Sequence, residues 1–333
     1  MKKIVLIILA IGILAYGSDV FASGECGFSC CLAGATGSGI TLAENIGLSL
    51  QYEFTYMENI KTGSTTVSPN SVITQHHGMY AIPTQMEMQK IALVAAVPVT
   101  NRLNIMVIAP YIINDMDMKM SVMSTPGAMA EVTGFGDMSV IGFYNIYEDA
   151  PVRPEQRLTG GLGLQMPTGA DNIKENGSYV HAMMQPGTGA WDPFISLNYM
   201  RAFYPLVLQL NIAYQISTES ALGYMFGDQF TYDLIGNYQA ADYINVGLQF
   251  NGIHTGHSID YKGNYSHNKM MVMPNDPNNT GLDSIMISPN IVAKIPNTGG
   301  SVMLKFQLPI YQYVNGTQQV VNWRLLASTT WVF

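Results

Sequence analysis

Methionine and histidine are the residues whose types and spacing in this sequence come closest to a known chemistry. The chain of 333 residues contains 22 methionines and 6 histidines. Several methionines alternate with another residue, and alternate side chains of a β-strand lie on one face. Thioether and imidazole groups are suitable ligands for Cu(I), thioether being the softer donor. The candidate ligands for copper or silver are Met86, Met88, Met116, Met118, Met120, His76 and His77.

The same methionines have a second interpretation. Methionine is a flexible apolar side chain that fills irregular gaps and contacts hydrophobic solutes, and the sequence shows no tight His/Cys site. Copper or silver would be a cargo rather than a cofactor, so no resident cofactor is predicted. Both interpretations of the methionines stay open on the sequence.

Catalytic residue types are present, but they lack the spacing that catalysis needs. No nucleophile-elbow sequence occurs, and the histidines fall in or beside expected loops. The chain holds 15 basic and 23 acidic residues, with no basic run after the N-terminus, which argues against a nucleic-acid partner. We therefore expect neither an enzyme nor a nucleic-acid-binding protein.

The strongest signal for an element that could position a site is the last stretch of the chain, VNWRLLASTTWVF. Trp323, Trp331 and Phe333 lie on one mainly apolar face of this strand, and Arg324 lies on the other. An apolar face with aromatic residues near its ends suits a lipid-facing strand of a transmembrane β-barrel. The terminal Phe also resembles the signal by which the barrel-assembly machinery recognises bacterial outer-membrane proteins.

Alternation of apolar and polar residues predicts about twelve strands in all. Short and long connections alternate strictly along the chain, as expected when short turns face the periplasm and long loops face outward. A long connection is expected after the eleventh strand as well. The expected strands cover residues 47–57, 86–99, 103–120, 133–147, 157–165, 191–199, 206–216, 230–238, 243–253, 284–294, 301–310 and 321–333.

Parity along these strands assigns polar side chains to the inside of the barrel, provided that no bulge changes the register. Pairing of the first and last strands would bring Glu53 and Arg324 to neighbouring positions facing the lumen. Charged residues there would set charge selectivity or form salt bridges that stabilise the barrel. The predicted lumen-lining residues are Glu53, Lys90, Asn104, Gln209, Asn211, Asp233, Gln249, Lys305 and Arg324.

The N-terminus and the composition indicate the compartment. Lys2 and Lys3 precede an apolar run at residues 4–16, so residues 1–22 read as a secretory signal peptide. Only 11% of residues are charged and the mean hydropathy is +0.15, as expected where every second residue of a strand meets lipid. We expect a periplasmic segment at 23–45 and a single barrel at 46–333, placed in the lipid of a Gram-negative outer membrane.

Three cysteines, Cys26, Cys30 and Cys31, lie just after the signal peptide. An odd number in an exported chain leaves at least one thiol without an intramolecular partner. A local disulfide with a spare cysteine and soft-metal binding are both compatible with this spacing. Glu25 and the residues before it make a poor lipid-attachment motif.

Glycine-rich motifs border three consecutive expected strands: TGFGDM at 133–138 opens the fourth, LQMPTGA at 164–170 closes the fifth, and GTGAWDPF at 187–194 introduces the sixth. Their succession resembles the outer-membrane transporter family named for the meta-cleavage pathway of phenol degradation. The resemblance implies passage of small, often aromatic or hydrophobic, compounds across the outer membrane. The glycines also fit turn and barrel-corner geometry, and the cysteine and methionine clusters depart from the family pattern.

These observations together predict an all-β chain that forms an antiparallel up-and-down transmembrane barrel and passes small-molecule solutes. Two alternatives remain: a barrel that handles copper or silver through a mouth rich in Met and His, and a non-conducting barrel with a structural or adhesive role.

Overall fold

The structure, a computed structural model, describes residues 46–150 and 154–333. The predicted signal peptide at 1–22 and the segment containing Cys26, Cys30 and Cys31 lie outside those residues.

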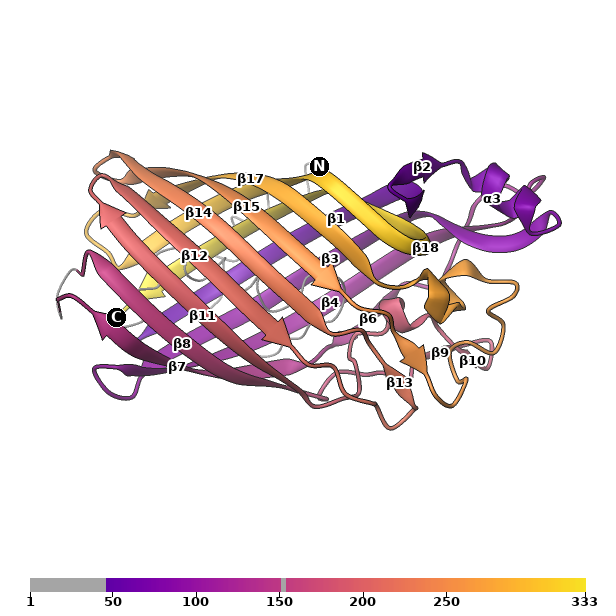
Figure 1. The fold of residues 1–333 in the computed structure, drawn as a ribbon, viewed down its shortest axis with the longest axis horizontal. Helices are drawn as coiled ribbons and strands as arrows, with labels where there is room; N and C mark the ends of the chain where they lie inside the picture. The colour runs from indigo at the N-terminus through magenta and orange to yellow at the C-terminus, as the bar shows by residue number, and fades with distance from the viewer. Residues whose placement is uncertain (1–45, 151–153) are drawn as a thin grey trace.

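One antiparallel sheet closes on itself to form a long barrel (Figure 1). Closure comes from the pairing of its last strand with its first, in which Gly47 faces Val332 and Glu53 faces Leu326. In sheet order the wall consists of β1 (Gly47–Gly63), β3 (Met79–Pro98), β4 (Leu103–Ser121), β7 (Met138–Glu148), β8 (Gln156–Met166), β11 (Asp192–Phe203), β12 (Leu206–Gln215), β14 (Gln229–Ala241), β15 (Ile244–Thr255), β17 (Leu282–Lys294) and β18 (Gly300–Val332).

Strand β18 is a hairpin of two arms. Its first half pairs antiparallel with β17, where Ser301 faces Lys294, and its second half pairs antiparallel with β1. Eleven alternating strands cannot close with every neighbour antiparallel, so β18 must reverse direction within its length. It does so at Gly316, whose φ of 62° is in the left-handed region that favours glycine. Counted by arms, the wall has twelve segments, and the predicted antiparallel transmembrane barrel is confirmed.

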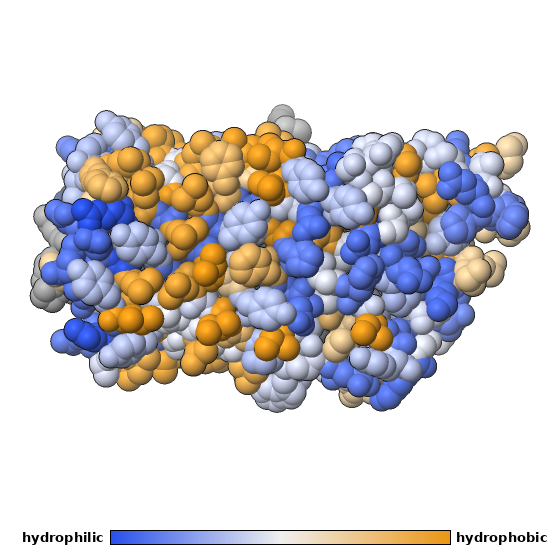
Figure 2. All heavy atoms as spheres, in the orientation of Figure 1, coloured by the Kyte–Doolittle hydropathy of each residue, from blue (hydrophilic) through white to orange (hydrophobic). Residues whose placement is uncertain are grey.

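Alternation along each strand separates an apolar outer face from an inner face that is mainly buried. Leu162, Ile195 and Leu234 are more than half exposed on the outside, while Ser196 and Asp233, each next in sequence to one of them, are buried on the inner face. On the face visible in Figure 2, apolar side chains gather over one half of the barrel, and the surface toward the other end is more polar. Trp323 stacks near Phe54, Tyr56 and Phe306 on the outer face, with ring centroids 5.3 to 5.8 Å apart. These four rings form part of the aromatic girdle expected at a membrane interface.

Connection lengths differ between the two ends of the barrel. The end that holds Gly47 and Phe333 has tight turns, such as the one between β14 and β15. By the rule for outer-membrane barrels this is the periplasmic end. The prediction of a long connection after the eleventh strand is wrong, because residues 311–320 continue the two arms of β18 up to the turn at Gly316.

The long connections carry the short elements, which gather at the outer end (Figure 1). Within the described residues, no helix has the length and hydropathy needed to span a membrane. These elements are β2 (Thr65–Val67), α3 (Pro69–Gln75), β5 (Gly127–Ala128), β6 (Val132–Phe135), β9 (Lys174–Glu175), β10 (Ser178–Tyr179), η1 (Ala182–Met184), β13 (Tyr224–Met225), β16 (Ile259–Asp260), η2 (Met273–Asn275) and η3 (Pro277–Asn279).

Candidate functional site

A carboxylate held between two cations lies inside the barrel where the sheet closes. Lys90 Nζ on β3 lies 2.9 Å from Glu53 Oε2, and Arg324 Nε on β18 lies 3.2 Å from Glu53 Oε1. Arg324 Nε also donates to Thr55 Oγ1 at 2.9 Å. All three charged side chains are at most 10% exposed. At such burial, mutual pairing is what offsets the cost of removing these charges from water.

Hydrogen bonds extend this trio along the inner wall into what we call the polar belt. Asn251 donates to Asp233 Oδ1 at 2.5 Å and accepts from Gln307 at 3.0 Å. Gln307 also lies 3.4 Å from the Arg324 guanidinium and thereby joins the belt to Glu53. In wall order the belt consists of Asp233, Asn251, Ser288, Gln307, Arg324, Glu53 and Lys90.

The other predicted lumen residues lie on the same inner face. Lys305 Nζ donates to Gln249 Oε1 at 2.9 Å, and both side chains are buried. Asn211 is the register partner of Asp233 on one side and of Asn198 on the other. The remaining two are Asn104, which is buried, and Gln209, which is partly buried.

Several inner-face polar atoms have no hydrogen-bond partner among the described residues. A buried polar group left in this state costs about 1–3 kcal/mol unless it is solvated. The atoms are Gln51 Nε2, Asn104 Nδ2, Gln209 Oε1, Ser284 Oγ and Ser328 Oγ. Water is the ordinary partner of such groups in proteins.

An apolar cluster occupies the inner face on the other side of the barrel. Phe143 on β7 and Phe194 on β11 are its aromatic members, 1% and 4% exposed. Val94, Met106 and Ile141 pack with them from β3, β4 and β7. The lumen therefore presents an apolar aromatic wall opposite the polar belt.

Methionines fill the outer part of the lumen in what we call the methionine cluster. Of the seven predicted metal ligands, the structure brings four into this cluster: Met86, Met88, Met116 and Met118. It adds five methionines that alternation alone did not single out as ligands: Met57, Met129, Met183, Met184 and Met286.

Three predicted ligands lie elsewhere, so this part of the prediction is corrected. Met120 is 61% exposed, because β4 ends one residue later at Ser121 and the chain turns there. His76 and His77 follow α3 in an exposed loop, and the His76 ring stacks on Tyr80 with centroids 3.8 Å apart. The predicted mixture of thioether and imidazole is therefore a cluster of thioethers.

A loop between β8 and β11, residues 167–191, covers the methionine cluster, and we call it the cap. Its Val180 and Met184 pack in one cluster with Met116 of β4 and Met286 of β17, so the cap reaches opposite walls of the barrel. Asn114 Nδ2 of β4 donates to the Met184 carbonyl at 3.2 Å. His181 hydrogen-bonds to Asn275 in the long loop between β15 and β17, and burial lowers the pKa of His181. The cap is thus anchored to the wall and to a neighbouring loop.

The glycine-rich motifs converge at the base of the cap. Asp137 Oδ2 accepts from the backbone N–H and the hydroxyl of Thr188, both at 2.7 Å, and Asp137 Oδ1 accepts from the Gly169 N–H at 3.0 Å. Asp192 accepts from the Thr218 N–H at 2.7 Å. A carboxylate that binds both ends of the cap, at 169 and at 188, holds the loop closed over the lumen.

Close backbone contact explains two of the motif glycines. A Cβ at Gly169 would lie 2.3 Å from the Gly136 Cα, and a Cβ at Gly187 would lie 2.5 Å from the Gly169 carbonyl carbon. Any side chain at either position would push the three segments apart. The sequence motif showed that these glycines recur, but only the fold shows that they stack on one another.

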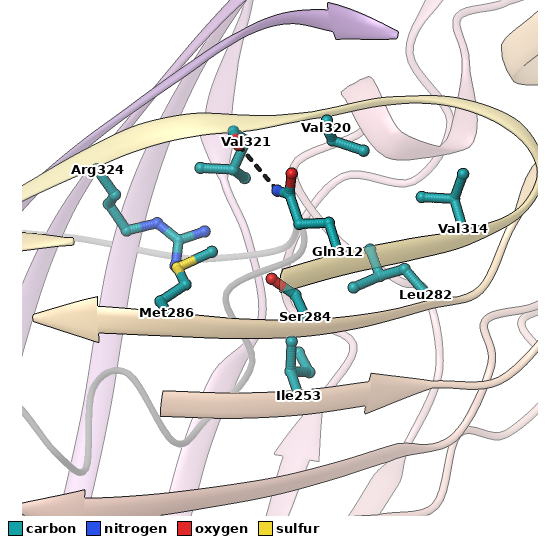
Figure 3. Close-up of a pocket in the computed structure, with 9 residues that line it drawn as sticks. All are labelled: Ile253, Leu282, Ser284, Met286, Gln312, Val314, Val320, Val321 and Arg324. Atoms are coloured by element: carbon teal, nitrogen blue, oxygen red, sulfur yellow. Dashed lines mark hydrogen bonds between the residues drawn. The ribbon is translucent and has the colours of Figure 1, made fainter. Parts of the chain in front are cut away.

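A small pocket lies between the polar belt and the methionine cluster. Arg324 from the belt and Met286 from the cluster both point into it (Figure 3). Its walls are otherwise mainly aliphatic, with Ile253, Leu282 and Val314 among them. The pocket thus offers an apolar surface with one guanidinium at its edge.

No family model matches the sequence, and no curated protein matches it. Solved structures do match. An outer-membrane channel from Pseudomonas putida F1 is similar with a TM-score of 0.57, at 12% identity over 87% of this chain and 96% of that one. A FadL homologue from Pseudomonas aeruginosa has a TM-score of 0.41, at 9% identity over 86% of this chain and 90% of that one. The CymD monoaromatic hydrocarbon channel has a TM-score of 0.40, at 9% identity over 97% and 96%.

At 12% identity the similarity to the P. putida channel is one of fold. Together with the closed antiparallel wall, the apolar band and the aromatic girdle, it identifies the chain as a β-barrel of the Gram-negative outer membrane. Membership of the transporter family suggested by the glycine-rich motifs stays a prediction.

Proposed function

We propose that this barrel is a channel that passes small solutes across the outer membrane. The observation that carries the proposal is the set of inner-face polar atoms that have no hydrogen-bond partner among residues 46–150 and 154–333, for which water is the ordinary partner. A hydrated interior inside a closed wall is a route for solutes, whereas a barrel that only anchors a surface structure has no need of one. The P. putida structure of the same fold is described as an outer-membrane channel.

The two walls of the lumen suggest which solutes pass. Phe143 and Phe194 offer aromatic contact on one side, and the pocket beside Arg324 is mainly aliphatic with a single cation. Binding sites for small organic molecules commonly combine apolar walls with a few polar groups. We propose that small solutes with an apolar or aromatic body are the cargo, as the resemblance to the phenol-pathway transporter family also implies.

Conductance and vesicle swelling test the proposal. Purified full-length protein should give unitary currents in planar bilayers, and vesicles that contain it should swell faster in small aromatic alcohols than in sugars of similar mass. Lys305→Gln removes a buried lumen cation and should shift the reversal potential in a salt gradient toward cation preference. Lys269→Gln, at an exposed loop position, is the matched control and should leave it unchanged.

The competing function is a non-conducting structural or adhesive barrel. Absence of current and swelling for the wild type, and also for a variant whose cap has been released, would support that alternative. A reversal potential that Lys305→Gln and Lys269→Gln shift equally would show that the current does not pass through the lumen.

A further inference from the structure

Four methionines stand directly opposite one another across four neighbouring segments at the outer end of the lumen. Met57 of β1 is the register partner of Met86 of β3, and Met86 is the register partner of Met116 of β4. The N–H of Met129 donates to the Met116 carbonyl at 2.9 Å and continues the row beyond β5. We call these four residues the methionine row.

All four side chains lie in the methionine cluster. Met57, Met86 and Met116 are at most 1% exposed, and Met129 is partly buried against them. Directly opposed residues on neighbouring antiparallel strands have Cβ atoms about 4.5–5.5 Å apart. A thioether sulfur is two bonds beyond Cβ, so adjacent members of the row can approach a single ion placed between them.

A fifth thioether approaches the row from the lumen side. Met184 of the cap is fully buried in the same cluster, and its carbonyl accepts from Asn114, which lies two residues before Met116 on the same face of β4. This hydrogen bond fixes the backbone of Met184 beside the row. The wall and the cap therefore contribute thioethers to one packed cluster.

Filling space does not by itself account for methionine at these positions. Burying a methionine costs up to about 1.5–2 kcal/mol of rotamer freedom, compared with about 0.5–1 kcal/mol for leucine or isoleucine. Strands also favour β-branched residues over flexible ones. Methionine loses more rotamer entropy on burial than leucine does, so a register-matched row of methionines indicates a role for the thioether sulfur, which leucine lacks.

The charge around the row favours a cation. Glu87 and Asp115 are register partners on the opposite face of β3 and β4, one residue away from Met86 and Met116. Two like charges directly opposite each other are unfavourable, and a cation held on the inner side of the same strands would reduce that repulsion. Thioethers select soft ions such as Cu(I) among the metals available to proteins.

We propose that the methionine row, closed by Met184, binds one soft monovalent cation, Cu(I) or Ag(I), at the outer end of the lumen. The site is distinct from the polar belt, and it uses only uncharged sulfur donors. It differs from the site predicted by sequence alternation, because Met120, His76 and His77 are not part of it.

Silver titration of the full chain tests the proposal directly. The background is Cys26→Ser/Cys30→Ser/Cys31→Ser, so that thiols do not compete, and Ag(I) as the nitrate is titrated calorimetrically into purified barrel. One ion should bind per chain, and native mass spectrometry should show the same stoichiometry. Cu(I), supplied with a competing chelator, should displace it.

Matched double variants locate the site. Met86→Leu/Met116→Leu should weaken Ag(I) binding by at least about tenfold, the lower end of what disturbing a metal site costs. Met106→Leu/Met303→Leu replaces two equally buried methionines outside the cluster and should leave the affinity unchanged. Heat-modified migration in gels verifies that each barrel is folded. If Met86→Leu/Met116→Leu does not fold, Met129→Leu, at a less buried position, replaces it as the test variant.

Two results would overturn the proposal. One is a cysteine-free barrel that binds no Ag(I), and the other is equal affinity in the two double variants. Either result would leave the row as a contact surface for apolar solutes. Neither depends on whether the barrel conducts.

Discussion

The polar belt and the methionine cluster occupy the same lumen only four residues apart, yet they are held together by different forces. β1 contributes Glu53 to the belt and Met57 to the cluster, and β3 contributes Lys90 and Met86. The belt depends on directional contacts between specific partners, so the loss of one group leaves another buried and uncompensated. The cluster depends on adaptable apolar contact, which tolerates exchange for side chains of similar volume.

This comparison shows that two similarly buried side chains in a barrel lumen can contribute very differently to the free energy of unfolding. Glu53 and Met57 are both less than 10% exposed and lie on the same face of one strand. Replacing the first removes a charge that two cations contact, whereas replacing the second changes only shape and polarizability. Substitutions in the polar belt should therefore lower the free energy of unfolding much more than substitutions in the methionine cluster.

The largest effect is expected from Glu53→Leu. The substitution leaves Lys90 and Arg324 buried without the carboxylate that lies 2.9 and 3.2 Å from them. Breaking a buried ion pair from one side costs about 3–5 kcal/mol. Urea unfolding in lipid vesicles, followed by tryptophan fluorescence, measures the loss. Glu53→Leu/Lys90→Met/Arg324→Met, which removes all three charges, should recover most of it, and a loss below about 1 kcal/mol in the single variant would contradict the ion-pair account.

A smaller but functional effect is expected from Asp137→Ala. Thr188 and Gly169 lose the carboxylate that their N–H groups share, at about 1–3 kcal/mol for each donor left without a partner. Because the cap is anchored there, its release should raise single-channel conductance and the rate of protease cleavage within residues 167–191. Asp242→Ala, at an exposed turn on the periplasmic end, is the control. Unchanged cleavage in Asp137→Ala would show that other contacts hold the cap.

A comparable loosening of the cap is expected from Gly169→Ala through a steric route. The new Cβ would lie 2.3 Å from the Gly136 Cα and 2.4 Å from its carbonyl carbon, so backbone must move. Overpacking of this kind costs about 1–3 kcal/mol. The measurement is again cleavage within the cap, compared with Gly127→Ala, where a Cβ meets nothing within 4 Å. Equal cleavage in the two variants would mean that the three segments separate easily.

Sequence alternation predicted the barrel well because lipid imposes the same rule on every strand. It placed Glu53, Lys90 and Arg324 on one inner face, and the structure brings the three into contact. It did not predict Met57, Met129 or Met184 as partners of Met86 and Met116. That grouping depends on the register between strands and on the path of the cap. Alternation within a single strand predicts neither of them.

One wrong prediction and one missed role have local physical causes. Residues 311–320 read as a loop because Asn315 and Gly316 punctuate a polar stretch, yet both arms of β18 continue to a tight turn at Gly316. Asp137 and the stacked glycines were visible as motifs, but their role required the fold, which brings residues 136, 169 and 187 together. The succession of short glycine motifs at the ends of consecutive strands was the one signal that pointed there.

The smallest effect on stability is expected from Met86→Leu/Met116→Leu in the cysteine-free background. Exchange of methionine for leucine conserves volume, and such swaps usually cost less than about 1.5 kcal/mol each. Urea unfolding without metal should therefore leave this variant much closer to wild type than Glu53→Leu.

Adding Ag(I) should then separate the double variant from the wild-type row and from Glu53→Leu, all three compared in the cysteine-free background. A ligand that binds only the folded state stabilises it by about 2.7 kcal/mol at one hundred times its dissociation constant. The wild-type row should gain this increment and the double variant should not, while Glu53→Leu should gain as much as wild type, because its methionine row is intact. An equal gain in all three proteins would mean that silver binds outside the row, and the contrast between a partner-specific belt and an adaptable, ligand-responsive cluster would no longer hold.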